Sequence, residues 1–237
     1  NLIINYFFGA ALNASLGIAN SVNGIIITFA QSVGRAISPQ ITKSYAAGNR
    51  QRTEDLVISA SKYTFLLLLL PALPIFLEID FILNLWLVDV PTHTANFIRL
   101  MLIDALIRAL NAGVPEAIFA SGKIKWYQLI INTIFLFSLP ASFVVLKLGA
   151  EPEALLLTYI GISIVALVIR QVLLYNIVGF NTKRLLLKSY LPSILVCVSL
   201  TPLFLFSFNH VHSIGVIIIA VFYLLLSVLI LGFNKQE

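Results

Sequence analysis

The chain has 237 residues, of which 59% are hydrophobic and only 11% are charged. A soluble domain carries about 25% charged residues, so this composition excludes an ordinary soluble protein and favours a chain surrounded by lipid. The apolar runs are continuous rather than alternating, which favours helices over a barrel. The sequence therefore predicts an all-α, polytopic transmembrane helix bundle. The net charge of +5 comes mostly from short loops, so it indicates membrane topology and not nucleic-acid binding.

The first 93 residues predict a partial helix, two spans and one interfacial helix. Residues 1–9 read as the end of a helix whose beginning is absent, so we expect a fragment that lacks the amino-terminal half of a longer protein. Long membrane segments are predicted at 11–45 and 56–77. The run FILNLWLV at 81–88 is too short to cross a bilayer and carries Trp86, which favours a position in the interface.

The rest of the chain predicts five further spans, at 94–120, 127–146, 154–179, 190–208 and 213–232. Each is long enough to cross a hydrocarbon core about 30 Å thick at a rise of 1.5 Å per residue. The total is seven full spans after the partial first helix.

Loops rich in Lys and Arg alternate with loops that have few or none, in the order of the predicted spans. Loops 43–62, 121–126 and 180–189 together with the tail hold ten of the fifteen Lys and Arg residues. The intervening loops hold one basic residue, Lys147. The positive-inside rule then places the basic loops and the carboxyl terminus in the cytoplasm.

A stripe of small and polar residues follows one face of the predicted span 11–45. Amides and an arginine would not face lipid, so the stripe must meet other helices or a water-filled cavity. Close helix packing and a substrate cavity both fit, and Arg35 could also reach the interface. The stripe comprises Asn13, Gly17, Asn20, Gly24, Gln31, Arg35 and Ser38. From it we take Asn20, Gln31 and Arg35 as cavity candidates.

The predicted span 94–120 carries the most charge. Asp104, Arg108 and Asn111 lie on one face, four and three residues apart, and Glu116 follows Pro115. Ionisable groups in a membrane usually face a pathway, although Asp104 and Arg108 could instead form an intrahelical pair that only neutralises itself. The two acids are also candidates to bind a coupling proton or sodium ion.

Arginine exceeds acid among the ionisable residues of the predicted spans. With Arg170 in the span 154–179, three arginines stand against Asp104 and Glu116. Guanidinium groups bind phosphate through a fixed fork of donors, so this excess suits an anionic substrate such as a diphosphate. No nucleotide-binding, metal or nucleophile motif accompanies them. The sequence therefore predicts no enzyme, cofactor or metal site.

Three segments carry a resemblance to a known family. They are GRAISPQITKSYAAGNRQR at 34–52, NLWLVDVPTHTANFIRLMLIDALI at 84–107 and FASGKIKWYQL at 119–129. These segments resemble bacterial O-antigen and capsule repeat-unit flippases of the multidrug/oligosaccharidyl-lipid/polysaccharide exporter superfamily. The resemblance extends over essentially the whole chain and is most specific in residues 1–130.

The resemblance implies a MATE-like fold of two six-helix lobes. Residues 1–179 would be the second lobe, and residues 180–237 an extra helix pair. It further implies a multi-pass protein of the bacterial inner membrane. Such a protein flips an undecaprenyl-diphosphate-linked oligosaccharide by alternating access, while the lipid tail stays among membrane lipids.

Two other functions remain open. A multidrug or cation antiporter of the same superfamily would favour acids over arginines in its cavity. A membrane-embedded polysaccharide polymerase or ligase would need a large outer loop with catalytic residues.

Overall fold

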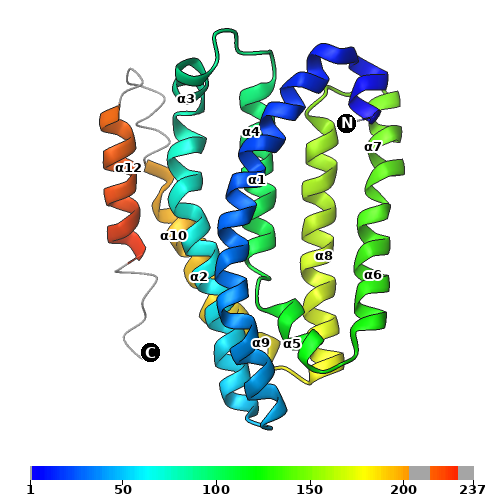
Figure 1. Ribbon diagram of the computed structural model, residues 1–237, viewed down its shortest axis with the longest axis vertical. Helices are drawn as coiled ribbons and strands as arrows, with labels where there is room; N and C mark the ends of the chain where they lie inside the picture. The colour runs from blue at the N-terminus through cyan, green and yellow to red at the C-terminus, as the bar shows by residue number, and fades with distance from the viewer. Residues whose placement is uncertain (1, 203–213, 229–237) are drawn as a thin grey trace.

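The computed structural model describes residues 2–202 and 214–228, and these residues form helices without any strand (Figure 1). The chain is an all-α transmembrane helix bundle. The predicted spans 190–208 and 213–232 lie partly outside the described residues. The elements in chain order are α1 (Leu2–Ala46), α2 (Arg50–Leu77), α3 (Ile79–Trp86), α4 (Thr94–Ala109), α5 (Val114–Ala120), α6 (Ile124–Leu136), α7 (Ser138–Lys147), α8 (Ala154–Val178), α9 (Thr182–Leu185), the π-helix η1 (Leu186–Tyr190), α10 (Leu191–Ser199) and α12 (Ile214–Ser227).

Four helical segments among the described residues are long and apolar enough to cross a membrane. They are α1, α2, the consecutive pair α6–α7 and α8. The junctions α1–α2, α5–α6 and α8–α9 gather at one end of the bundle in Figure 1, and the junctions α3–α4 and α7–α8 at the other. We call these the basic end and the acidic end. The residues within or next to the first set of junctions include Lys43, Arg50, Arg52, Lys123, Lys125, Lys183 and Arg184, and the second set of junctions holds Asp89, Glu151 and Glu153.

Helix α1 joins the predicted partial helix and the first predicted span. Gly9 has φ 81° and ψ −172°, which is non-helical and bends the chain there. Glycine adopts this positive φ without a steric penalty. The bend turns the first turns of α1 over the acidic end, above α7 and α8 (Figure 1).

The boundary of α2 corrects the prediction for loop 43–62. The helix begins at Arg50, because the Asn49 side chain accepts a hydrogen bond from the Arg52 backbone N–H at 3.1 Å and so caps it. Lys62, predicted in a basic loop, therefore lies inside α2 and is only 2% exposed. The predicted span 56–77 already contains Lys62, and what it missed is the start of the helix, because the first six residues, 50–55, are all polar.

The predicted span 94–120 is also corrected, since it is two helices and not one. Gly113 and Pro115 follow α4, and Pro115 has no N–H to donate to the carbonyl of Asn111. Helix α4 has 16 residues and rises about 24 Å, so it needs α5 to reach across a bilayer. Gly113 packs so closely on α2 that an added Cβ would lie 2.6 Å from the Val57 carbonyl oxygen.

The predicted span 127–146 is likewise divided, into α6 and α7. Pro140 cannot donate to the carbonyl of Leu136, and α6 ends at that residue. The two helices follow one another almost directly, so the segment Ile124–Lys147 still forms one membrane-crossing unit. Its outward face, with that of α8, exposes large apolar side chains such as Leu129, Leu136 and Leu157, as lipid contact requires.

Two apolar clusters form the core, and polar residues lie between them. On α1 the first cluster extends to Ile26 and the second begins at Ile41. Helix α1 packs against α2, α4 and α5, while α8 packs against α4, α5, α6 and α7. Between Ile26 and Ile41 no side chain of α1 is buried in either cluster, although Ala30 packs against the first and Ile37 against the second.

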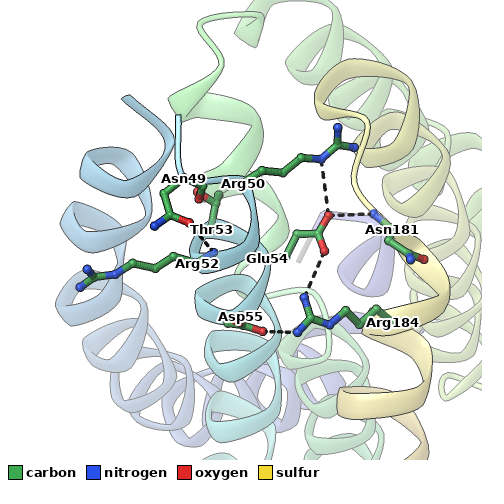
Figure 2. A network of polar contacts seen from close by, with 8 residues as sticks. All are labelled: Asn49, Arg50, Arg52, Thr53, Glu54, Asp55, Asn181 and Arg184. Carbon is green, nitrogen blue, oxygen red and sulfur yellow. Dashed lines mark hydrogen bonds and ion pairs between the residues drawn. The ribbon is translucent and has the colours of Figure 1, made fainter. Parts of the chain in front are cut away.

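A network of ion pairs joins α2 to the linker before α9 at the basic end (Figure 2). The Arg184 guanidinium contacts Glu54 Oε2 at 3.3 Å and Asp55 Oδ1 at 2.7 Å. Glu54 Oε1 accepts the Asn181 backbone N–H at 3.4 Å and lies 3.7 Å from Arg50 Nε. This network ties residues 1–179 to the helices that follow them.

Candidate substrate cavity

A cavity of about 540 Å³, called the larger cavity below, lies between α1, α2, α4 and α5. Its size falls within the range of about 300–1,000 Å³ that is usual for small-molecule sites. Three predicted residues from α1 and α4 line it, namely Gln31, Arg35 and Arg108, and α5 adds Glu116. Leu68, Ala105 and Ala109 of the first apolar cluster form part of its wall.

Arg35 and Arg108 differ in their surroundings. Arg35 is exposed and has no ion-pair partner among residues 2–202 and 214–228. Arg108 pairs with Asp104 at 2.8 Å and lies 4.9 Å from the ring centroid of Phe135 on α6. The predicted intrahelical pair is therefore confirmed, but the Arg108 side chain is still 42% exposed. Both guanidinium groups consequently remain accessible to a ligand in the cavity.

Glu116 is the acidic group of the larger cavity. It stands in the first turn of α5, directly after Pro115, and accepts a hydrogen bond from the Ser38 hydroxyl of α1. Thr64 of α2 also lines the cavity; it is 2% exposed, and its hydroxyl has no hydrogen-bond partner among the described residues.

A second, smaller cavity of about 230 Å³ lies between α1, α4 and α8. It includes the predicted residues Asn20, Asp104 and Arg108, so Arg108 belongs to both cavities. Asn23 and Tyr159 complete its polar lining.

Asp104 is held from two sides at the boundary between the cavities. Ser163 of α8 donates a hydrogen bond to its Oδ1, and Arg108 pairs with its Oδ2. The carboxylate side chain is 17% exposed. Arg108 compensates the charge, and the hydrogen bond from Ser163 joins α4 to α8.

Asn111 and Arg170 do not line either cavity. Asn111 is 2% exposed, and its Oδ1 accepts hydrogen bonds from Tyr190 at 2.6 Å and Gln171 at 2.7 Å. Asp104 and Asn111 thus both bond to α8, through Ser163 and Gln171 respectively. Arg170 lies beside Tyr127, which interacts electrostatically with both Arg170 and Glu116.

Four residues of interest escaped the sequence analysis. Asn23 lies three residues after Asn20 on the same face of α1, so helical periodicity could have found it. Thr64 and Tyr159 belong to no motif, and the burial of Lys62 has no signal in the sequence. Their positions depend on which helices meet, and no local pattern signals that.

No family model, curated protein or solved structure matches the chain. What can be said of function therefore rests on the helix bundle and on the two cavities described above.

Proposed function

We propose that the chain forms part of a membrane transporter that flips an undecaprenyl-diphosphate-linked oligosaccharide by alternating access. The observation that carries this proposal is the larger cavity, which is lined by the two arginines Arg35 and Arg108 and by one carboxylate, Glu116. A charge in the middle of a membrane is expensive and is retained where it serves a function. Arginine is the side chain best suited to phosphate, because its donors match two phosphate oxygens at once.

Arg35 is the strongest candidate for direct substrate contact. Its charge has no partner among the described residues, whereas the charge of Arg108 is partly compensated by Asp104. A diphosphate between them would supply the missing anion. The apolar outer surface of α6, α7 and α8 meets lipid, so the polyprenyl tail can remain in the membrane while the head group crosses.

The proposed location is the bacterial inner membrane, with the basic end in the cytoplasm. The positive-inside rule supports this orientation, since the basic junctions share one end. The lipid-linked substrate would enter from that end.

A multidrug or cation antiporter of the same superfamily is the second candidate. Glu116 and Asp104 each accept a hydrogen bond from a serine hydroxyl on another helix. Either carboxylate could bind a proton or sodium ion and couple its movement to transport. In an antiporter the acids would be indispensable and the arginines would not.

The test replaces Arg35 with alanine in a host that depends on the protein for surface polysaccharide. Loss of surface polymer, with lipid-linked repeat units accumulating inside and normal protein in the membrane, supports the flippase. Arg52→Ala is the matched control, because Arg52 is exposed at the basic end and forms no ion pair with the described residues.

The role of Arg108 is tested with a double variant that carries both Arg108→Gln and Asp104→Asn, since removing one partner alone would leave an uncompensated charge. Normal export by both Arg35→Ala and the double variant would refute the proposal. If export is normal but drug or cation resistance is lost in Glu116→Gln, the antiporter is the better description.

A further inference from the structure

The two cavities meet at one side chain. Arg108 lines the 540 Å³ cavity together with Arg35, and it lines the 230 Å³ cavity together with Asp104. A ligand bound at Arg108 therefore has a cationic space on one side and a different, smaller space on the other. The lining of the smaller space indicates what it could hold.

The smaller cavity combines neutral polar groups with apolar walls. Asn20 and Asn23 reach it from α1, and Tyr159 reaches it from α8, beside Asp104 of α4. Leu16, Leu100, Met101, Leu155 and Leu156 form the rest of the lining. The side-chain oxygen of Asn23 is buried and accepts no hydrogen bond from the described residues.

This combination matches a sugar ring better than a phosphate. A sugar hydroxyl both donates and accepts, and amide and phenol groups do the same. A phosphate in this cavity would be repelled by the negative charge of the Asp104 carboxylate, whereas a sugar hydroxyl could donate a hydrogen bond to that carboxylate. Leucine side chains suit the C–H faces of a pyranose. The volume of 230 Å³ is below the ~300 Å³ lower bound of drug-sized sites, so it suits one ring and not a chain of sugars.

We propose that the smaller cavity is a subsite for the sugar attached to the diphosphate. The proposal rests on the proposed flippase function. The diphosphate lies against Arg35 and Arg108, and the first sugar extends past Arg108 to the amides of Asn20 and Asn23. The subsite would make transport selective for that sugar.

The experiment measures binding of water-soluble short-chain polyprenyl diphosphates to the purified protein in lipid nanodiscs. One probe carries no sugar. The others carry a single N-acetylglucosamine, N-acetylgalactosamine, galactose or glucose. The variants are Asn20→Ala, Asn23→Ala and Tyr159→Phe, the last of which keeps the aromatic ring. Asn176→Ala on α8 is the matched control, because this amide is exposed and lines neither cavity.

We expect at least one sugar-bearing probe to bind the unmodified protein more tightly than the sugar-free probe. Each subsite variant should reduce that advantage by about 2–10-fold, the effect of one hydrogen bond, without changing the affinity for the sugar-free probe. Arg35→Ala should weaken all probes alike, and Asn176→Ala should weaken none.

Two outcomes would overturn the subsite. In one, all sugar-bearing probes bind no better than the sugar-free diphosphate. In the other, the subsite variants and Asn176→Ala retain the full sugar advantage. Both leave the flippase proposal standing, because the diphosphate still binds. If the sugar-free probe and the sugar-bearing probes all fail to bind, the flippase proposal fails and the subsite with it.

Discussion

Replacement of Glu54 by alanine tests whether the basic-end network holds the helices together (Figure 2). The Glu54 side chain is 12% exposed and the Arg184 side chain 25%, so this pair is mostly shielded from water. Loss of one partner of a buried pair costs about 3–5 kcal/mol, and an exposed pair contributes about 0–1 kcal/mol. In this variant Arg184 keeps its ion pair with Asp55. The lost ion pair between Glu54 and Arg50 contributes little stability, because the Arg50 side chain is 68% exposed. We therefore expect Glu54→Ala to lower the free energy of unfolding by about 2 kcal/mol, a value between these two limits.

The assay is thermal unfolding of the purified protein in lipid nanodiscs. For a chain of this size, a loss of about 2 kcal/mol corresponds to a fall in Tm of about 4–8 °C. Asp55→Asn should lower the Tm much less, because the Asp55 side chain is 49% exposed. Arg52→Ala is the matched control from the same turn of α2. If Glu54→Ala unfolds no earlier than Arg52→Ala, the network does not stabilise the bundle and the reasoning is refuted.

Three further predictions concern packing, pH and the buried amide cluster. Gly113→Ala should destabilise the protein by about 1–3 kcal/mol, because the new Cβ would lie 2.6 Å from a backbone carbonyl oxygen of α2. Gly24→Ala is the control and should not destabilise it, because the space around Gly24 is open. The Tm values of the two variants test this prediction. Burial raises the pKa of Glu153 at the acidic end, but hydrogen bonds from His93 and a neighbouring amide outweigh it, so the pKa is lowered. The folded state should therefore gain stability from this carboxylate above its ordinary pKa of 4.5 and lose it as the pH falls further, and the Tm difference from Glu153→Gln should shrink on acidification. Tyr190→Phe removes two hydrogen bonds of 2.6 and 2.7 Å and should lower stability by about 1–2 kcal/mol in the same unfolding assay, and an unchanged Tm would contradict a structural role for the cluster.

The sequence predicts the helices of this bundle well because their signal is local. Apolar runs about 20 residues long show where a chain can satisfy its backbone inside lipid, and α1, α2, α6–α7 and α8 follow from them. The alternation of basic loops predicts which junctions share an end, and Figure 1 places them so. The intrahelical pair of Asp104 and Arg108 is equally local, since residues four apart on a helix are neighbours.

Boundaries and breaks were predicted less well. The start of α2 depends on the Asn49 cap, which begins the helix six residues before the apolar run at Leu56. The break between α4 and α5 depends on Gly113 fitting against α2 as well as on Pro115. Other prolines, such as Pro71 in α2, lie within unbroken helices, so proline alone did not show where a helix ends.

The sequence by itself determined that this is an all-α membrane bundle with charged residues in its interior. Composition, apolar length and loop charge suffice for that, because each is a property of contiguous residues in contact with one solvent. Only the tertiary structure decided that Gln31, Arg35, Arg108 and Glu116 share one cavity while Asn111 belongs to a buried cluster with Tyr190 and Gln171. The physical reason is that a cavity is bounded by side chains from several helices, and its lining depends on how helices distant in sequence pack and rotate against one another.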